Sequence, residues 1–422
     1  MQLSREYTPE NHPTCGVHLS NETITEILEF LIPGCIILSI TPLEHGKSFN
    51  NRIIFIKIEV PYDYLIAGLR NESVNELVLK LNGQFFDLSK SLNEVSCLSL
   101  LRALIPEVPS PNVLAWSSTK SSIIHRFTPQ GIPERKILQL RSEDLEQHHE
   151  WILMTTVPGN PLPNFDLGKE ELKTIGRQLA DIVFGWRTRL PISATAGNLY
   201  CKASNERTQA LNCFEIAGLQ IAPSSSMAGF DVEVLEPITN MIQYYRLKLE
   251  TRLRKLQDLD VFKKNAYLIP IIRQFIAARL PQLEICKGED HFTFTHNDLS
   301  PRNILVSLDP TRITGVIDFE FSGFFPELDE FVNDAVCNEG DWPAALYEAY
   351  LDRLEECGMK TPRNGVNERL WKEATMLARL EENIAPWWLE NISPSDQNDL
   401  SEELVRPGKM VLEAIRLLHS AT

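Results

Sequence analysis

The segment 296–318 limits the possible folds of this chain more than any other part of its sequence. It contains two alternating apolar runs, 304–308 and 313–317, which are joined by a short link that begins Asp-Pro. Asp and Pro in this order are typical of a tight turn, so the runs are predicted to pair as an antiparallel hairpin. The residue before the first strand of such a hairpin lies beside the residue after the second. The sequence therefore predicts that Asn303 and Asp318 are neighbours in space.

Asp298 precedes this hairpin by one short loop, so it joins Asn303 and Asp318 in a group of oxygen-bearing side chains. Phosphoryl transfer from a nucleotide needs a carboxylate that accepts or orients the proton of the attacking hydroxyl or amine. It also needs hard oxygen ligands for Mg²⁺. Asp298 suits the first role, and Asn303 with Asp318 suits the second. Each residue alone is also consistent with a cap, a turn or a strand end, but their combination in this order favours the catalytic interpretation.

A lysine and a glutamate in the first third of the chain could complete such a site. Residues 76–81 read as a short strand with Lys80 near its end, and residues 89–104 read as an amphipathic helix with Glu94 in its first turns. A strand lysine and a helix glutamate form the ion pair that holds a phosphate-binding lysine in kinases. The alternative is a surface lysine and a solvated glutamate.

Strand material at 35–43 and 51–60 is separated by a polar break. A strand, a turn and a second strand would suit a loop that covers a nucleotide, and Gly46, Ser48 and Asn50 are its candidate contacts. The break has a single glycine, so an ordinary hairpin is the alternative reading.

The chain changes character at Pro158-Gly159, a strong break in secondary structure. It is β-rich before this point and mainly helical after it, which predicts a bilobal α+β fold with lobes 1–157 and 158–422. Residues 190–230 are expected to be an irregular loop that helps to line a substrate pocket. Helices are expected at 16–33, 169–189, 231–257, 265–283, 344–357, 367–389 and 401–419.

The net charge of −16 argues against nucleic acid as the main partner. The first residues lack the basic and apolar segments of a signal peptide, and no apolar run is long enough to span a bilayer. The eight cysteines have no metal-binding spacing and are predicted to be reduced. We therefore expect a cytoplasmic protein that binds neither nucleic acid nor a membrane.

These motifs resemble those of the aminoglycoside phosphotransferase family, the small-molecule branch of the protein-kinase-like fold. Supporting matches lie in the first lobe and at its end, and the likeness runs in order from about residue 40 to 340. The segment ENIAPWWL (382–389) is similar to the C-terminal part of fungal members. The matching segments are HNDLSPRNILV (296–306), ITGVIDFEFSGFFPELDEF (313–331), ELVLK ending at Lys80, NEVSCLSLLRALIPEVPSPNVLAW (93–116) and WILMTTVPG (151–159).

The resemblance implies that ATP or GTP binds between the lobes. The backbone at Thr155, Thr156 and Val157 would form the hinge that holds the base. Lys80 would contact the phosphates, and Glu94 would orient Lys80.

The resemblance also assigns the residues of the second lobe. Asp298 would be the catalytic base, and Asn303 and Asp318 would hold Mg²⁺. His296 would belong to the catalytic site as a brace for its loop rather than as an acid or base.

Three departures from related patterns bear on the acceptor. Ser300 stands where Ser/Thr protein kinases have a lysine, and Glu320 stands where they have the glycine of Asp-Phe-Gly. No activation-segment ending of the Ala-Pro-Glu kind follows, so a small-molecule acceptor is expected. Asn297 takes a place that is usually glycine in the family loop.

The segment from Asp318 to Asp341 holds eight acidic residues and no lysine or arginine, which suggests a cationic amine or amino-alcohol acceptor. A solvated acidic face is the alternative. Glu320 is a candidate for a second metal or substrate contact, or for a structural salt bridge. Trp387 and Trp388 could stack on a cationic group, although their spacing also fits a helix core.

The sequence thus predicts an ATP-dependent phosphotransferase that acts on a hydroxyl of a small molecule. A kinase-like binding protein without transferase activity is the main alternative. A third interpretation keeps the site but uses the phosphate to activate a group for a later biosynthetic step. The acceptor and the oligomeric state are left open.

Overall fold

A computed structural model describes most of the chain. It covers residues 12–44, 47–61, 74–83, 89–117, 123–127, 133–137, 150–203, 214–216, 219–223, 226–227, 230–233, 237–288, 291–309, 311–336, 340–390 and 403–420. Gly46, a predicted nucleotide contact, lies outside these residues.

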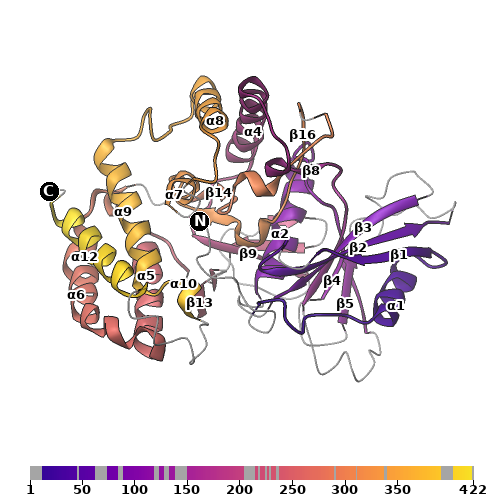
Figure 1. Ribbon diagram of the computed structural model, residues 1–422, viewed down its shortest axis with the longest axis horizontal. Coiled ribbons are helices and arrows are strands. Elements are labelled where there is room, and N and C mark those ends of the chain that lie inside the picture. Colours follow the sequence, from indigo (N-terminus) through magenta and orange to yellow (C-terminus); the bar gives the residue numbers. More distant parts are fainter. Residues whose placement is uncertain are drawn as a thin grey trace.

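The first lobe is built on one antiparallel sheet, at the right of Figure 1. Strand β3 lies between β2 and β7 near the middle of this sheet, so Lys80 projects from a strand that is supported on both sides. The strands, in spatial order, are β1 (Ile36–Pro42), β2 (Asn51–Glu59), β3 (Val74–Asn82), β7 (Trp151–Thr155), β4 (Val113–Ser117), β5 (Ile123–Phe127) and β6 (Pro133–Ile137).

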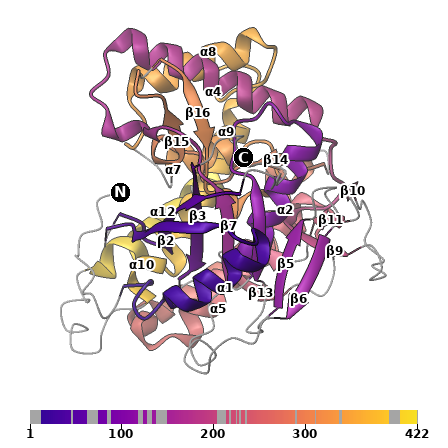
Figure 2. The ribbon, with the colours of Figure 1, turned by 90° about the vertical axis from the view of Figure 1, so that its right-hand side faces the viewer.

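Helix α1 (Asn21–Leu31) covers one face of this sheet (Figure 2). Its N-cap is Ser20, whose side chain accepts a hydrogen bond from the backbone N–H of Thr23. Ile24, Ile27 and Leu28 belong to the buried apolar cluster of the lobe. Burial of each such side chain contributes about 1.5–3 kcal/mol, so packing, more than helix propensity, holds this short helix in place.

Helix α2 (Ser89–Leu104) joins the two lobes. Val95, Leu98 and Leu101 belong to the same apolar cluster as the helices of the second lobe. The helix predicted at 89–104 is present, but its pattern of burial differs from that of a simple amphipathic helix, because Leu104 is 39% exposed and Glu94 is buried. The helix lies between the lobes and is covered on more than one side.

The second lobe is mainly helical, as expected, and occupies the left and top of Figure 1. No helix in the described part of the chain has the length and apolarity to cross a membrane. The α-helices are α4 (Lys169–Arg189), α5 (Met241–Asp258), α6 (Ile269–Gln274), α7 (Asp329–Val336), α8 (Ala344–Glu356), α9 (Glu368–Ile384), α10 (Trp387–Glu390) and α12 (Val405–Ser420).

Three of the predicted helices differ from the structure. The helix expected from residue 231 begins only at Met241, where the side chain of Asn240 caps it. The segment 265–283 is a series of short helical turns rather than one helix, and Pro270 and Pro281 each remove a backbone donor there. The helix expected at 367–389 is divided into α9 and α10 at Ala385-Pro386 for the same reason.

Residues 190–230, expected to be an irregular loop, contain short strands instead. The alternation of apolar and polar residues in these strands was obscured by the small residues around them. One of them, β9, pairs with β17, which follows Glu320 in the chain, and so supports the segment that carries Asp318 and Glu320. The strands of this sheet, in spatial order, are β10 (Phe214–Ile216), β11 (Leu219–Pro223), β9 (Gly197–Ala203), β17 (Gly323–Phe325) and β14 (Thr293–Thr295), and β12 (Ser226–Met227) pairs separately with β13 (Phe230–Glu233).

The hairpin predicted from the segment 296–318 is confirmed, although its strands are shorter than expected. Strand β15 (Ile304–Val306) pairs antiparallel with β16 (Ile313–Val316), with Ile304 opposite Val316. Strand β8 (Asn160–Pro161), which follows the end of the first lobe, pairs with the other edge of β15. This hairpin is therefore attached directly to the connection between the lobes.

Candidate active site

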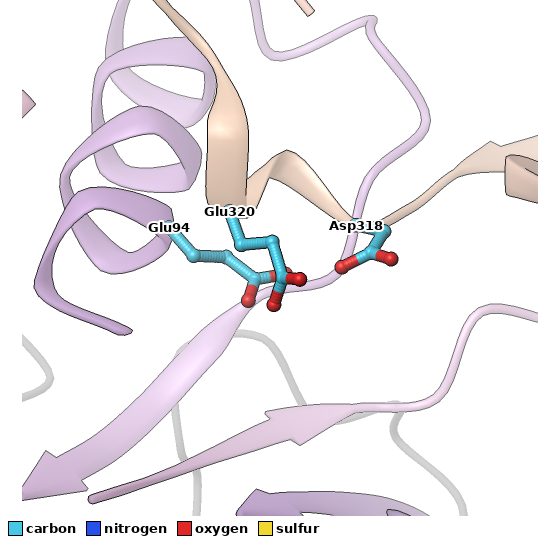
Figure 3. A group of neighbouring side chains, drawn as sticks. All are labelled: Glu94, Asp318 and Glu320. Carbon is cyan, nitrogen blue, oxygen red and sulfur yellow. The ribbon is translucent and has the colours of Figure 1, made fainter. Parts of the chain in front are cut away.

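Lys80 lies at the centre of a buried group of carboxylates. Its Nζ is 2.6 Å from Glu94 Oε2, 2.6 Å from Asp318 Oδ1 and 3.0 Å from Glu320 Oε2. Figure 3 shows that Glu94 reaches the group from α2, while Asp318 and Glu320 come from the chain after the hairpin. The predicted pair of Lys80 and Glu94 is thus present, and residues more than two hundred positions apart meet at one ammonium group.

The carboxylates around Lys80 have different proton affinities. Burial raises the pKa of Glu94 to about 7, against the opposite effect of Lys80. Burial would also raise the pKa of Glu320, but Lys80 and Lys90 outweigh it and lower that pKa to about 2. Glu94 is therefore protonated more readily than Glu320, which keeps its negative charge.

Asn303 is paired with Ile317, the residue before Asp318, so the ends of the hairpin lie together as predicted. The backbone N–H of Ile317 donates to Asn303 O at 3.0 Å, so the residues that precede and follow the hairpin lie side by side. Asn303 Nδ2 donates to Asp298 O at 2.8 Å and to Asp298 Oδ2 at 3.1 Å. The atom that Asn303 can offer to a cation is therefore its Oδ1.

The donor set suits Mg²⁺, because an amide oxygen and a carboxylate are hard ligands and Mg²⁺ uses few protein carboxylates. Glu94, Asp318 and Glu320 also bring carboxylate oxygens within 4.8 Å of one another. However, Lys80 already contacts all three, so this trio has its own cation. Asn303 and Asp318 fit the metal better.

Asp298 lies at the start of the same loop and is held from two sides. Asn303 contacts one carboxylate oxygen, and Arg302 Nη2 lies 2.7 Å from the other, Oδ1. Arg302 Nη1 also contacts Asp341 Oδ2 at 2.8 Å. Burial raises the pKa of Asp298 to about 7 despite Arg302, so this carboxyl can take up a proton near neutral pH.

His296 is completely buried and supports the loop before Asp298. Its Nε2 lies 3.0 Å from Ile317 O, and its backbone N–H donates to Glu330 Oε2 at 3.0 Å. Its backbone carbonyl accepts from Ser322 Oγ at 2.9 Å. Burial lowers the pKa of His296 to about 4, so the ring is neutral at physiological pH. These contacts link the start of the loop to the segment 317–330, which agrees with the structural role predicted for His296.

Two residues of the site adopt the left-handed backbone conformation that favours glycine. Asn297 has φ 61° and Asp318 has φ 70°. Asn and Asp tolerate this region better than other residues with a side chain. The asparagine at 297 therefore meets the requirement that a glycine meets in the family pattern.

The structure places the remaining predicted residues as follows. Ser48 and Asn50 line the cleft, as do Thr155, Thr156 and Val157 at the end of β7. The strand end is fixed by Thr155 N, which donates to Asn112 O at 2.9 Å, and by Thr156 N, which donates to Glu76 O at 3.2 Å.

The candidate substrate residues separate into different environments. Glu320 is buried behind Lys80 and accepts hydrogen bonds from Asn50 and Asn51. Trp387 lines the cleft and its ring meets Phe49 edge to face at 5.5 Å. Trp388 packs against the core of the second lobe.

Four further residues at the site were not predicted from the sequence. Arg302 contacts Asp298, and Asn51 and Lys90 contact Glu320. Asn93 donates to the carbonyls of Glu320 and Ser322 at 2.8 and 2.9 Å. Arg302 could have been predicted from its position. Ser300 stands where Ser/Thr protein kinases have a lysine, and Arg302, four residues after Asp298, is the next cation along the loop.

The residues from both lobes line one cleft of about 1670 Å³. One wall carries Lys80 and Glu94, and the other carries Asp298, Asn303 and Asp318. A β-rich lobe that presents the lysine, a helical lobe that presents the acidic loop, and a cleft between them define a protein of the protein-kinase-like fold.

Comparison with known proteins agrees with this class. The model of the phosphotransferase enzyme family (APH) matches residues 69–365. This match spans more than half of the chain, so the chain belongs to that family. The family prediction is confirmed, and with it the class of enzyme, a small-molecule kinase.

Solved structures show the same fold at low sequence identity. The streptomycin–ATP–APH(2'')-IIa ternary complex is 13% identical, with a TM-score of 0.51, and the alignment covers 94% of this chain and 99% of that one. ADP-bound APH(2'')-Ib is 12% identical, with a TM-score of 0.51 and coverage of 93% and 99%. The gentamicin–APH(2'')-IIa complex is 14% identical, with a TM-score of 0.50 and coverage of 95% and 96%. No curated protein matches the chain.

Proposed function

We propose that the protein transfers the γ-phosphoryl group of ATP, or of GTP, to a hydroxyl of a small molecule. The observation that carries this proposal is that the two halves of a phosphoryl-transfer site line the same cleft. Lys80, paired with Glu94, faces it from one lobe, and Asp298 with Asn303 and Asp318 faces it from the other. The lobes would be 1–157 and 158–422, and the cytoplasm, where ATP is abundant, is the proposed location.

In the proposed reaction the acceptor hydroxyl donates a hydrogen bond to Asp298. The hydroxyl oxygen forms a bond to the γ-phosphorus as the bond from that phosphorus to the β–γ bridging oxygen breaks. The proton passes to the Asp298 carboxylate. The electron pair of the broken bond leaves with the nucleoside diphosphate, ADP or GDP. Lys80 would contact the phosphates, and the backbone at 155–157 would bind the base.

Asn303 and Asp318 would hold Mg²⁺, and the metal would neutralise charge on the phosphate oxygens when it is bound. This chain's own residues prepare that role. Asn303 is oriented by Asp298, and Asp318 is held by Lys80 and by its left-handed backbone. His296 would brace the loop and would not exchange a proton in the reaction.

We propose that the acceptor is less strongly cationic than the acidic run alone suggests. Much of the acidic run that suggested it is internal, because Glu320 pairs with Lys80 and Glu330 lies within 3.8 Å of Arg187. Asp341 does line the cleft, where it pairs with Arg302 and could also meet an amine. Trp387 could stack on that amine, whereas Trp388 packs in the core.

The rest of the acceptor wall carries both signs of charge. Lys248, Arg252 and Lys255 project into the cleft from α5 and alternate with acidic partners. Glu381 Oε2 lies 3.0 Å from Lys248 Nζ, and Glu390 Oε2 lies 2.8 Å from Lys255 Nζ. We therefore propose an acceptor that combines an amine with an anionic or strongly polar group, and not a polycation.

The Asp298→Asn variant tests the proposal. It keeps the size of the side chain but removes the proton acceptor, so we expect turnover to fall at least about a hundredfold while nucleotide affinity persists. Acceptors can be found by incubating a metabolite extract with enzyme and Mg-ATP and searching by mass spectrometry for a species that gains one phosphate. Wild-type turnover by the variant would refute the assignment of Asp298.

Thermal unfolding with Mg-ATP separates the enzyme from the kinase-like binding protein. Stabilisation by Mg-ATP followed by transfer supports the proposal, and the absence of stabilisation would favour the binding protein. A phosphorylated species that is consumed by a later reaction would instead support the activating role.

A further inference from the structure

Lys90 is a second lysine beside the Lys80 group, in contact with Glu320, and the proposed function gives it no role. Its side chain is 0% exposed. Its Nζ lies 3.0 Å from Asn51 Oδ1, 3.3 Å from Asn50 O and 3.6 Å from Glu320 Oε2. An ammonium group is costly to bury unless it is paired. The contacts of Lys90 therefore indicate what its charge does.

Those contacts fix the end of the loop that would cover the nucleotide. The carbonyl of Asn50 accepts from Lys90 and also from Gly83 N at 2.9 Å. Asn51 donates to Glu320 Oε2 at 2.8 Å, and Asn50 donates to Glu320 Oε1 at 3.2 Å. The loop end in one lobe is thereby tied to the segment that follows Asp318 in the other. A loop that is poor in glycine gains a fixed position in this way.

The charges around Lys80 explain why a second cation is needed. Glu94, Asp318 and Glu320 all lie within 3.0 Å of Lys80 Nζ. In the described part of the chain, Lys90 is a second lysine that contacts this group, through Glu320. Without the charge of Lys90, the three carboxylates would surround the Lys80 ammonium group alone. The site is buried, so the Coulomb attraction between these groups is stronger than in water. Glu320 would then hold Lys80 more firmly, and the excess negative charge would repel phosphates.

We propose that Lys90 is a positioning residue for the nucleotide. It offsets the charge of Glu320, so that Lys80 remains available to the phosphates, and it holds the nucleotide loop at Asn50 and Asn51. It acts through these neighbours and touches no reacting atom. This inference rests on the proposed function, because it presumes that a nucleoside triphosphate binds in the cleft.

The test compares Lys90→Met in two backgrounds, the wild-type chain and the Glu320→Gln variant. The probe is an ATP analogue with a fluorescent label on the ribose, and its Kd is measured without and with Mg²⁺. In the wild-type background we expect Lys90→Met to weaken binding roughly tenfold under both conditions, since it unbalances the charges. In the Glu320→Gln background the same change should weaken binding by less than about threefold, because the charge that Lys90 offsets is gone. Lys173→Met, a change at an exposed lysine, is the matched control and should leave Kd unchanged.

Each outcome decides the question. If the loss on Lys90→Met is equal in both backgrounds, or absent in the wild-type background, Lys90 has no electrostatic role and this inference alone is overturned. If the wild-type chain itself binds no analogue, the proposed function fails and the inference with it. Thermal melts identify any variant whose folding is impaired. If Lys90→Met unfolds in the wild-type background but folds and binds in the Glu320→Gln background, the dependence on Glu320 is supported in its strongest form.

Discussion

The left-handed backbone at Asn297 yields a sharp prediction, because it lies next to the proposed catalytic base. Its φ of 61° is a conformation that costs an alanine about 1–2 kcal/mol and costs a glycine almost nothing. Asn297→Ala and Asn297→Gly both remove the side chain. The difference between these two variants therefore isolates the backbone requirement.

The expected magnitude follows from two opposing effects. At an ordinary position glycine is less stable than alanine by roughly 0.5–1 kcal/mol, because it loses more chain entropy on folding. At position 297 the left-handed strain outweighs that loss, so Asn297→Gly should be more stable than Asn297→Ala by roughly 0.5–1 kcal/mol. Thr174, an exposed residue within α4, is the control, where the order should reverse and alanine should be favoured by about 1 kcal/mol.

Urea unfolding of the four variants measures these differences, and a turnover assay reports their effect on Asp298. Alanine at position 297 can relieve its strain only by moving the loop. A displacement of Asp298 on the order of 1 Å should lower kcat about a hundredfold, whereas Asn297→Gly should keep most of the activity. If alanine is at least as stable and active as glycine at position 297, the conformation of this loop and its link to catalysis are refuted.

Two further changes test the neighbours of Asp298. Arg302→Gln removes the cation that contacts Asp298 and Asp341, so kcat should fall roughly 10- to 100-fold. Release of the nucleoside diphosphate measures this rate, and an unchanged kcat would exclude Arg302 from the reaction. His296 has a folded-state pKa of about 4 against an ordinary value of 6.5, so the unfolded chain binds a proton first as the pH falls. Relative to a His296→Gln variant, the wild-type chain should lose about 2 kcal/mol of unfolding free energy between about pH 7.5 and about pH 5. A difference between the two proteins that is constant over this range would show that the buried ring is not neutral.

Local patterns were sufficient to predict the parts of the site that depend on short stretches of chain. The hairpin after Asn303 followed from turn residues and alternation, and it brought Asn303 to Asp318 as expected. A strand and the next helix made the pair of Lys80 and Glu94 one of two interpretations, and the family resemblance favoured it. In each case the geometry of one or two neighbouring elements fixes the distance, so the sequence carries the information.

Contacts between distant segments were not predictable in the same way. The strands at 197–233 were missed because each is short and derives its register from a neighbour, as β9 does from β17. Lys90 reads as a solvated residue at the start of a helix, and only the position of α2 between the lobes makes it a buried partner of Glu320. Asn93 escaped notice for the same reason.

The acidic run from Asp318 to Asp341 shows most clearly why charge in a sequence window is a poor guide to charge in a cleft. Glu320 is matched by Lys80 and Lys90, which lie more than two hundred residues earlier, so its position in the run says nothing about its surroundings. A carboxylate buried in a folded protein must find a cation or hydrogen-bond donors, and the chain supplies them from whichever segment packs there. The more completely a carboxylate is buried, the less its charge reaches a ligand. We therefore expect the acceptor to be selected by the groups that remain at the cleft surface, and these include the cations of α5, which the acidic run did not suggest.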